Sequence, residues 1–359
     1  MSRDGTVQRA ARTMEYGRPA VLTSGCRCTG RRRTSFKYRE FGYRLQTQET
    51  GVLVAQALTV ADRLGLSARA HLHFTDRRVN ALLGLTPSAE AAMAMITLDM
   101  AASADAAAGP PVTYESLVEQ PVPDPLFDVP PIGDRLPVTA ALHEAGMTDT
   151  QGPSPGPPLD PRPGGRVIAL PRVPVRPADG IDRRCSPPDG FLPDAIGMAP
   201  LAGLLEASGT GCPGSVHATA LYCLASRVDG IAAGAYRYDP AEHTLTEIGG
   251  ISHTLVAVLS RTPVGEAAAV LLPVGDPLGG FSPFGARWYR LLQADVGFAL
   301  QRGALAAAAC GLATRIHSGE AHELTTGLGL DGTPAVLSAL LIGVPRAAST
   351  WEDRMWHRR

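Results

Sequence analysis

The chain has 359 residues, and its 45% apolar composition is typical of a globular protein long enough for two domains. Its formal net charge of −1 excludes a global attraction to nucleic acid or anionic membrane. The six cysteines lack the paired CxxC spacing of zinc sites, no signal peptide opens the chain, and no apolar run reaches membrane-spanning length. We therefore expect a cytoplasmic protein without a metal, nucleic-acid or membrane partner.

Residues 1–34 hold eight arginines and show no clear amphipathic period, so we expect an irregular N-terminus. A frayed or truncated start is the favoured interpretation, and a basic arm for an acidic partner is the alternative. Cys26 and Cys28 form a lone CxC, which we interpret as reduced thiols.

Lys37 is the only lysine in the chain, and it directly precedes Tyr38. Lysine can lose its proton and tune a neighbour, whereas arginine stays charged. A single lysine on a solvated loop remains the alternative interpretation.

The next segments follow helical and strand periods in turn. Leu53, Ala57, Val60 and Leu64 form one helical stripe, which predicts a helix over 45–64 that ends at Gly65. We then expect a strand at 70–74, a helix from Thr75 or Asp76 to Leu83, and a buried strand at 91–100.

The same order recurs near the C-terminus. At a shift of about 246 residues, Tyr43-Arg44 falls on Tyr289-Arg290, Gly51 on Gly297, and His71 on His317. A match of this length indicates a structural repeat. It predicts a helix over 289–310, a strand at 314–317, a short helix and a strand at 335–344. The copies differ where Lys37-Tyr38 has become Pro283-Phe284.

Between the copies, residues 110–163 hold 14 of the 31 prolines, which predicts an extended and exposed linker. Beyond it we expect strands at 166–170 and 218–226 around a helix at 198–207. Residues 234–239 and 244–248 read as a hairpin that turns at Pro240.

These elements predict an α+β chain of one and a half related units. The expected boundaries are an N-terminus at 1–34, half a unit at 35–105, a linker at 106–164, a complete domain at 165–347 and a tail at 348–359.

Two strings match GxGxxG, at 209–214 and 327–332, but neither follows a strand and opens a helix as a dinucleotide site requires. His71 and His73 could chelate a metal, but only His71 recurs, so a packing or hydrogen-bonding role is favoured. Arg183-Arg184-Cys185-Ser186 combines two guanidinium groups with small polar neighbours, and with free backbone amides it would suit a phosphate. A solvated surface arginine pair is the alternative.

Together these residues resemble the nitroreductase-like flavoproteins, in particular the SagB-type (McbC-like) dehydrogenases. Arg183-Arg184-Cys185-Ser186-Pro187 stands where that family has an RRSxR-like string. Residues 211–218, with Gly214 and His217, stand for a PSxGALHP-like segment, and 234–245 for a GxYxYdp hairpin. A KYGxRxYR-like string matches twice, at 37–44 and 283–290.

The resemblance implies a nitroreductase-like fold, in which a mostly antiparallel central sheet is flanked by helices, and FMN as cofactor. It implies that Arg183, Arg184, Cys185, Ser186, Gly214 and His217 bind FMN, and that Lys37 and Tyr38 are catalytic. Cys185 and Pro187 depart from the pattern and would loosen a flavin phosphate site. Family members bind FMN between two units, so the two parts of this chain could complement each other.

The activity that the resemblance implies is oxidation of thiazolines and oxazolines to thiazoles and oxazoles in modified peptides, a step of antibiotic-type biosynthesis. Tyr38 would be the base, and the adjacent Lys37 would favour its tyrosinate form. The implied partners are a leader-bearing precursor peptide and a cyclodehydratase, with a homodimer or an intrachain pseudo-dimer as the assembly. Two alternatives stay open: a catalytically degenerate scaffold subunit, and a generic flavin-dependent NAD(P)H oxidoreductase.

Overall fold

The computed structural model describes residues 22–26, 36–85, 87, 91–99, 136–148, 165–213, 216–250, 252–261, 263–330 and 332–346. They belong to two compact units. The first unit comprises Met1–Pro157, Gly211–His217 and Pro277–Phe298, and the second comprises Pro158–Thr210, Ala218–Asp276 and Ala299–Arg359. This grouping assigns 211–217 and 277–298 to the N-terminal part, whereas the sequence places a single domain over 165–347. The predicted boundaries therefore stay a prediction.

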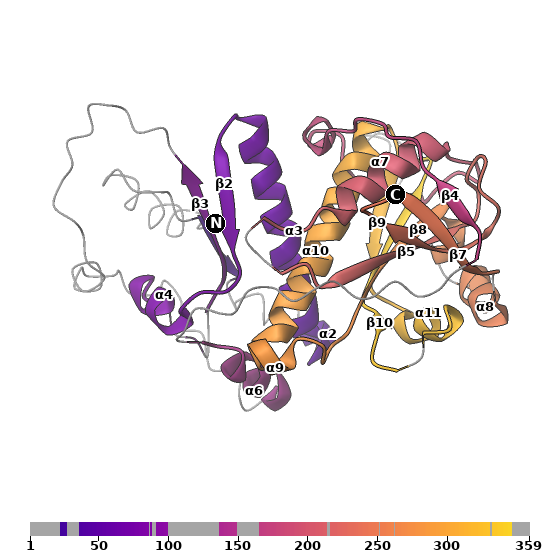
Figure 1. The fold of residues 1–359 in the computed structure, drawn as a ribbon. Coiled ribbons are helices and arrows are strands. Elements are labelled where there is room, and N and C mark those ends of the chain that lie inside the picture. Colours follow the sequence, from indigo (N-terminus) through magenta and orange to yellow (C-terminus); the bar gives the residue numbers. More distant parts are fainter. Residues whose placement is uncertain are drawn as a thin grey trace, which may run out of the picture. The chain divides into compact units, whose positions relative to one another are not determined.

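The first unit is built on a long helix and a three-stranded antiparallel sheet of order β1-β3-β2 (Figure 1). Its early elements are β1 (Leu22–Cys26), α2 (Phe36–Tyr38), α3 (Phe41–Arg63), β2 (Ser67–His71), α4 (Asp76–Leu82) and β3 (Ala91–Asp99). The predicted helices and the later strand are confirmed, and Gly65 leaves α3 with a φ of 70°. The strand predicted at 70–74 lies three residues earlier.

The buried face of α3 is not the predicted stripe. Leu53 and Leu64 are 49% and 67% exposed. The helix instead buries small and polar residues, among them Gln48, Gly51 and Ala55. Close helix packing favours small residues over leucine, and this is the physical reason why the apolar period indicated the wrong face.

Two predictions of irregular structure are wrong. Leu22–Cys26 forms β1, which pairs with β3, although the N-terminus was predicted to be irregular. The expected linker contains α6 (Pro137–Ala145). Its first turn is capped by the Glu40 carboxylate, which accepts hydrogen bonds from the amides of Val138 and Thr139 and from the Thr139 hydroxyl. Because Glu40 is far from 137–145 in the sequence, no pattern near the start of α6 predicts this cap.

The second unit holds an eight-stranded sheet of order β4-β7-β6-β5-β8-β11-β9, with β10 paired to β8. Every strand pair in it is antiparallel, which confirms the mostly antiparallel sheet that the resemblance implied. The strands are β4 (Val167–Ala169), β5 (Thr219–Ala225), β6 (Gly234–Asp239), β7 (Thr244–Gly249), β8 (Ala269–Gly275), β9 (Ala313–His317), β10 (Ala335–Val336) and β11 (Ala339–Gly343). The helical elements after the linker are η2 (Pro177–Gly180), α7 (Met198–Gly209), α8 (His253–Arg261), η3 (Pro263–Glu266), α9 (Phe281–Phe284), α10 (Arg287–Ala309) and α11 (Ala321–Gly327).

The predicted hairpin is β6–β7, and a buried histidine fixes its turn. His243 has a φ of 56° and is 2% exposed. Its Nε2 lies 3.2 Å from the Pro171 carbonyl oxygen, which can only accept a hydrogen bond. In a neutral ring Nδ1, 2.9 Å from the Tyr238 hydroxyl oxygen, then accepts a hydrogen bond from that hydroxyl. The pairing of Tyr238 with His243 offsets the cost of a left-handed residue that is not glycine.

The repeat is confirmed at the level of elements. The order α3, β2, α4, β3 recurs as α10, β9, α11, β11, and the second copy differs because its last predicted strand is split into β10 and β11. In both copies the two strands pair antiparallel.

Within the first unit the two long helices cross at equivalent glycines (Figure 1). A Cβ on Gly51 would lie 1.9 Å from the carbonyl oxygen of Ala294, and a Cβ on Gly297 would lie 1.9 Å from that of Gln48. Because Ala294 is the repeat equivalent of Gln48, the contact is self-complementary, as at a two-fold axis. The stacked rings of Tyr43 and Tyr289, an equivalent pair, lie 6.1 Å apart at an angle of 10°.

We expect Gly51→Ala and Gly297→Ala each to lower the free energy of unfolding by about 1–3 kcal/mol, because each added methyl overlaps a backbone carbonyl. Gly250→Ala is the control, since a Cβ there has no atom within 4 Å. Chemical denaturation of the three variants measures the effect. Equal midpoints for all three would show that the crossing is not tightly packed.

A buried charge cluster joins α4 to the start of α10. The Asp76 carboxylate is 1% exposed and contacts the Arg287 guanidinium at 2.5 Å and that of Arg290 at 3.0 Å. Arg287 also donates to the carbonyls of Leu72 and Gly146. Burial lowers the pKa of Arg287 to about 10. Two cations and one anion leave this cluster with a formal charge of +1.

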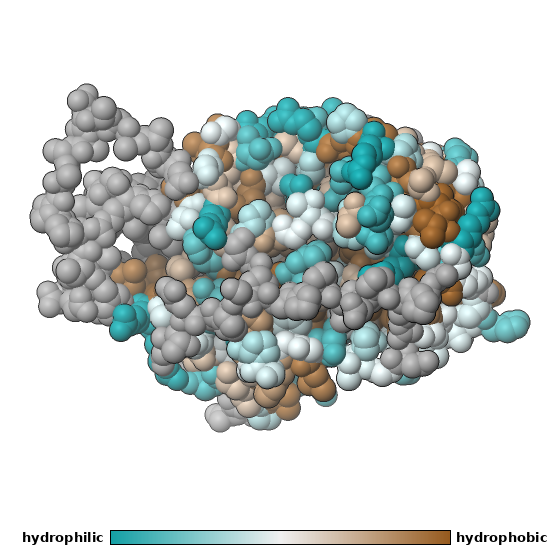
Figure 2. Space-filling model, in the orientation of Figure 1, coloured by the Kyte–Doolittle hydropathy of each residue, from teal (hydrophilic) through white to brown (hydrophobic). Residues whose placement is uncertain are grey.

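Among the described residues, no helix has the length and apolarity needed to cross a membrane. Hydrophilic and hydrophobic residues are interspersed over the face shown in Figure 2.

Candidate functional site

Lys37 and Tyr38 lie together in α2, and both side chains are exposed. The Lys37 ammonium nitrogen is 5.0 Å from the centroid of the Tyr38 ring, a cation–π distance. The Tyr38 ring centroid is in turn 6.5 Å from that of Phe41. The pair therefore presents a hydroxyl and an ammonium to the surroundings of α2.

A left-handed residue directly follows the pair. Arg39 has a φ of 50°, and the chain resumes as a helix at Phe41. The repeat equivalent of Arg39 is Gly285, which also has a positive φ, of 55°. Glycine adopts this conformation freely, whereas an arginine there costs about 1–3 kcal/mol. Such strain is typical of functional positions and here adjoins the Lys37-Tyr38 pair.

The second copy has lost this exposed pair. Phe284, which stands for Tyr38, is only 8% exposed. Its ring stacks on Trp288 with centroids 5.8 Å apart, and its edge meets His73 at 6.0 Å. The equivalent of Tyr38 is thus a packing residue without a hydroxyl.

Arg183, Arg184, Cys185 and Ser186 follow η2 in the second unit, and all four are exposed. The expectation of free backbone amides is wrong for the two arginines, because both amides donate to the Gly180 carbonyl, at 3.1 and 2.9 Å. Phosphate recognition would therefore depend on the guanidinium side chains, which are suited to it. This donor set fits a phosphate group in its chemistry.

His217 belongs to the first unit and pairs with a residue that the sequence did not indicate. Its Nδ1 lies 3.8 Å from a carboxylate oxygen of Asp295, which is 2% exposed. Asp295 raises the pKa of His217 against the opposing effect of burial. A Cβ on Gly211 would lie 3.0 Å from the same Nδ1, so glycine makes room for the ring. Asp295 lies 78 positions away on α10, and no motif linked it to the histidine.

Gly214 is the last of the predicted FMN-binding residues, and Cys212 lies two positions before it in the sequence. Gly214 lies outside the described residues. Cys212 is buried, and burial together with Asp295 raises the pKa of its thiol to about 12. A thiol with such a pKa is a poor nucleophile at neutral pH. The predicted residues are therefore divided: Lys37, Tyr38 and His217 belong to the first unit, and Arg183–Ser186 to the second.

The histidines considered as metal ligands have other contacts. His71 Nε2 lies 3.1 Å from the Thr97 hydroxyl, and His73 packs against Phe284. Across the described ranges, no group of three His, Cys, Asp or Glu residues could hold a metal ion.

Neither a protein-family model nor a curated protein matches the chain. Among solved structures, a nitroreductase-type protein from Anabaena variabilis superposes with a TM-score of 0.68 at 20% identity, covering 95% of this chain and 73% of its own. A nitroreductase-type protein from Ralstonia eutropha has a TM-score of 0.41 at 20% identity, over 54% of this chain and 99% of its own.

A further match is to the Escherichia coli microcin synthetase McbBCD complex with truncated pro-MccB17 bound. Its TM-score is 0.40 at 19% identity, over 46% of this chain and 70% of the matched chain. The Anabaena match extends over nearly the whole chain and agrees with the antiparallel sheet and its helices. The chain has the nitroreductase fold.

Proposed function

We propose that the protein is an FMN-dependent dehydrogenase that oxidises thiazoline or oxazoline rings to thiazoles or oxazoles in a ribosomally made peptide. The observation that carries the proposal is the exposed Lys37-Tyr38 pair, followed by the left-handed Arg39, on a chain with the nitroreductase fold. The sequence motifs that resemble SagB-type enzymes supply the substrate class.

In this proposal the arginine side chains of 183 and 184 hold the FMN phosphate, with the Cys185 and Ser186 side chains beside them. Gly214 and His217 also contribute to cofactor binding, and His217 is favoured in its cationic form by Asp295. FMN, when bound, supplies the redox chemistry by accepting a hydride from the heterocycle.

The protein's own catalytic groups are Lys37 and Tyr38. The Tyr38 hydroxyl oxygen, as tyrosinate, removes the proton that the heterocycle loses besides the hydride. Lys37 places its ammonium nitrogen 5.0 Å from the Tyr38 ring centroid, and a cation at this distance stabilises a phenolate anion by Coulomb attraction. Phe284 has no hydroxyl, so the second copy offers no equivalent base.

The partners that follow from this function are a leader-bearing precursor peptide and a cyclodehydratase that makes the azoline. Assembly as a homodimer or as an intrachain pseudo-dimer belongs to the same proposal. The self-complementary crossing at Gly51 and Gly297 favours the pseudo-dimer, because one chain already contains the paired helices.

The first experiment is the visible absorption spectrum of the purified protein, with the released chromophore identified after denaturation. We expect a yellow protein that releases FMN in near-stoichiometric amount. A colourless protein that FMN does not reconstitute would contradict the proposal. It would favour a scaffold subunit, for which the occupied amides of Arg183 and Arg184 and the packed Phe284 are the supporting observations.

A further inference from the structure

Glu40 lies directly after the segment 37–39, and its side chain contacts α6 rather than its own helix. Its carboxylate accepts hydrogen bonds from the amides of Val138 at 3.3 Å and Thr139 at 2.7 Å, and also from the Thr139 hydroxyl. Glu40 is the N-cap residue of α3, but its side chain makes no capping bond to α3. The carboxylate therefore ties the turn before α3 to the first turn of α6, within the first unit.

The backbone next to Glu40 is one that needs a restraint. Arg39 has a φ of 50°, a conformation that residues other than glycine keep only where surrounding contacts enforce it. The Arg39 carbonyl accepts a hydrogen bond from the Gly42 amide at 3.0 Å, which fixes the chain on the side of α3. The Glu40 carboxylate adds a contact with a second element. Without it, we expect Arg39 to return toward ordinary backbone angles and so to redirect the two residues before it.

Other contacts hold α6 in place independently of Glu40. The Tyr43 hydroxyl lies 3.3 Å from His143 Nδ1, and the two rings meet edge to face with centroids 5.9 Å apart. At the far end of α6, the Arg287 guanidinium donates to the Gly146 carbonyl at 3.1 Å. The bonds to Glu40 therefore restrain the turn at Arg39 more than they restrain α6.

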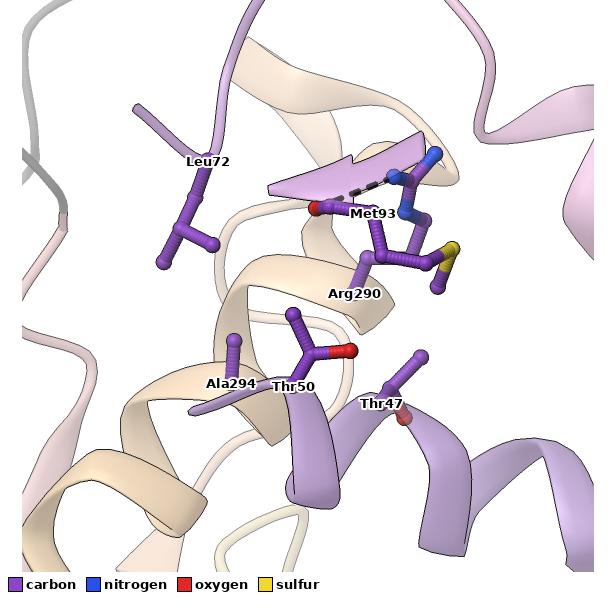
Figure 3. A pocket seen from close by; sticks show the side chains of 6 residues that line it. All are labelled: Thr47, Thr50, Leu72, Met93, Arg290 and Ala294. Carbon is purple, nitrogen blue, oxygen red and sulfur yellow. Dashed lines mark hydrogen bonds between the residues drawn. The ribbon is translucent and has the colours of Figure 1, made fainter. Parts of the chain in front are cut away.

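The anchor at the far end of α6 is itself firmly held. Arg287 shares the buried Asp76 carboxylate with Arg290. Arg290 also donates to the Met93 carbonyl of β3 at 3.3 Å, the bond drawn as a dashed line in Figure 3. Because this cluster joins the start of α10 to α4 and β3, α6 is attached to a rigid part of the first unit.

The second copy lacks the carboxylate and does not need it. Ala286 stands at the position of Glu40 and has no polar side chain. Before it, Gly285 has a positive φ of 55°, which glycine adopts freely. The carboxylate thus occurs in the copy that carries both the strained arginine and the Lys37-Tyr38 pair.

We infer that Glu40 is a positioning residue for the Lys37-Tyr38 pair, and that it acts by holding the strained turn at Arg39 against α6. In this arrangement the ammonium nitrogen stays 5.0 Å from the tyrosine ring centroid. The effect of Glu40 on rate rests on the proposed dehydrogenase function, whereas its effect on the geometry of the pair can be measured without any activity.

The single lysine of the chain makes this geometry directly measurable. Protein that contains isotope-labelled lysine gives side-chain NMR signals from Lys37 alone, and the Tyr38 ring shifts these signals upfield while the ammonium group lies over it. Tyr38→Leu removes the ring and defines the unshifted position. We expect Glu40→Ala to move the signals most of the way to that position. Glu40→Gln keeps an acceptor oxygen and should move them less.

Glu144→Ala is the matched control. Glu144 is a carboxylate on α6 that pairs with Arg77 at 2.8 Å, so its loss removes the same charge without touching the turn, and the Lys37 signals should stay in place. Thr139→Val removes one bond to Glu40 from the side of α6 and should shift the signals in the same direction as Glu40→Ala. Unshifted signals in Glu40→Ala, or in Thr139→Val should Glu40→Ala not fold, would overturn the inference and leave Glu40 as a cap of α6 alone.

The effect on rate is measured with an azoline peptide and the flavin-loaded protein. Glu40→Ala should lower kcat by about 10–100-fold and change KM by less than about twofold, because a displaced catalytic group affects the chemical step. A fall in kcat without a change in the Lys37 signals would also overturn the inference. Absence of azoline turnover by wild type would refute the proposed function alone, because the NMR comparison tests the position of the pair by itself.

Discussion

Tyr38→Phe is expected to leave FMN bound and to reduce azoline oxidation by about 10²-fold or more, the usual contribution of a general base. The substitution removes one hydroxyl from an exposed ring, so it should disturb neither the fold nor the Lys37 contact. The measurement is the turnover of a defined azoline peptide by the flavin-loaded variant, with kcat and KM determined separately. A loss in kcat identifies the hydroxyl as part of the chemistry.

Two further variants make this result interpretable. Lys37→Arg keeps the positive charge but changes its geometry, and should retain more activity than Lys37→Ala. Tyr222→Phe removes a hydroxyl from a buried ring of the second unit and serves as the control for a general loss of tyrosine. Wild-type turnover by Tyr38→Phe would refute the assignment of Tyr38, and loss of FMN from it would instead make Tyr38 a cofactor-binding residue.

Elements that depend on local residue patterns could be predicted from the sequence. The helices α3, α4, α7 and α10 were predicted from their residue patterns, although no N-cap side chain bonds to the first turn of α3, α4 or α7. The β6–β7 hairpin follows from alternation around Pro240. The repeat in the sequence predicted that the two segments would have the same order of helices and strands. It did not reveal that Gly51 and Gly297 mark their crossing, because a glycine within a helix has several explanations until its neighbour is known.

The features that were missed depend on residues far apart in the chain. The helix α6 follows a proline-rich stretch and is capped by Glu40, 98 positions upstream of Val138. Asp76 meets Arg287 and Arg290 more than 200 positions away, and only the two arginines three residues apart on α10 could have suggested a buried partner. The pairing of His217 with Asp295 likewise joins two residues that are far apart in the chain. For the candidate site, the sequence indicated which residues to consider. It did not show that Lys37, Tyr38 and His217 belong to one compact unit and 183–186 to the other.

Asp76→Asn is expected to destabilise the first unit by about 3–5 kcal/mol, because it leaves two buried guanidinium groups without their common carboxylate. Denaturant unfolding, with the midpoint and slope compared to wild type, measures the loss. Glu144→Gln is the matched control. Glu144 forms an ion pair of 2.8 Å with Arg77, but both side chains are about 60% exposed, and such pairs contribute about 0–1 kcal/mol. Similar losses for the two variants would show that burial does not strengthen the cluster.

The pKa of the Asp76 carboxyl group also determines how the stability of the protein depends on pH. Burial alone would raise the pKa of Asp76, but the guanidinium groups of Arg290 and Arg287 outweigh it and hold this pKa below its ordinary value. A group whose pKa is lower in the folded state adds stability above its unfolded pKa, about 3.9 for aspartate, and this stability is lost as pH falls toward the folded value. Wild type should therefore lose stability between neutral and strongly acidic pH more steeply than Asp76→Asn, which has no proton to bind at this position. Parallel stability–pH curves for the two proteins would mean that Asp76 has the same pKa in the folded and unfolded chain, contrary to the geometry of the cluster.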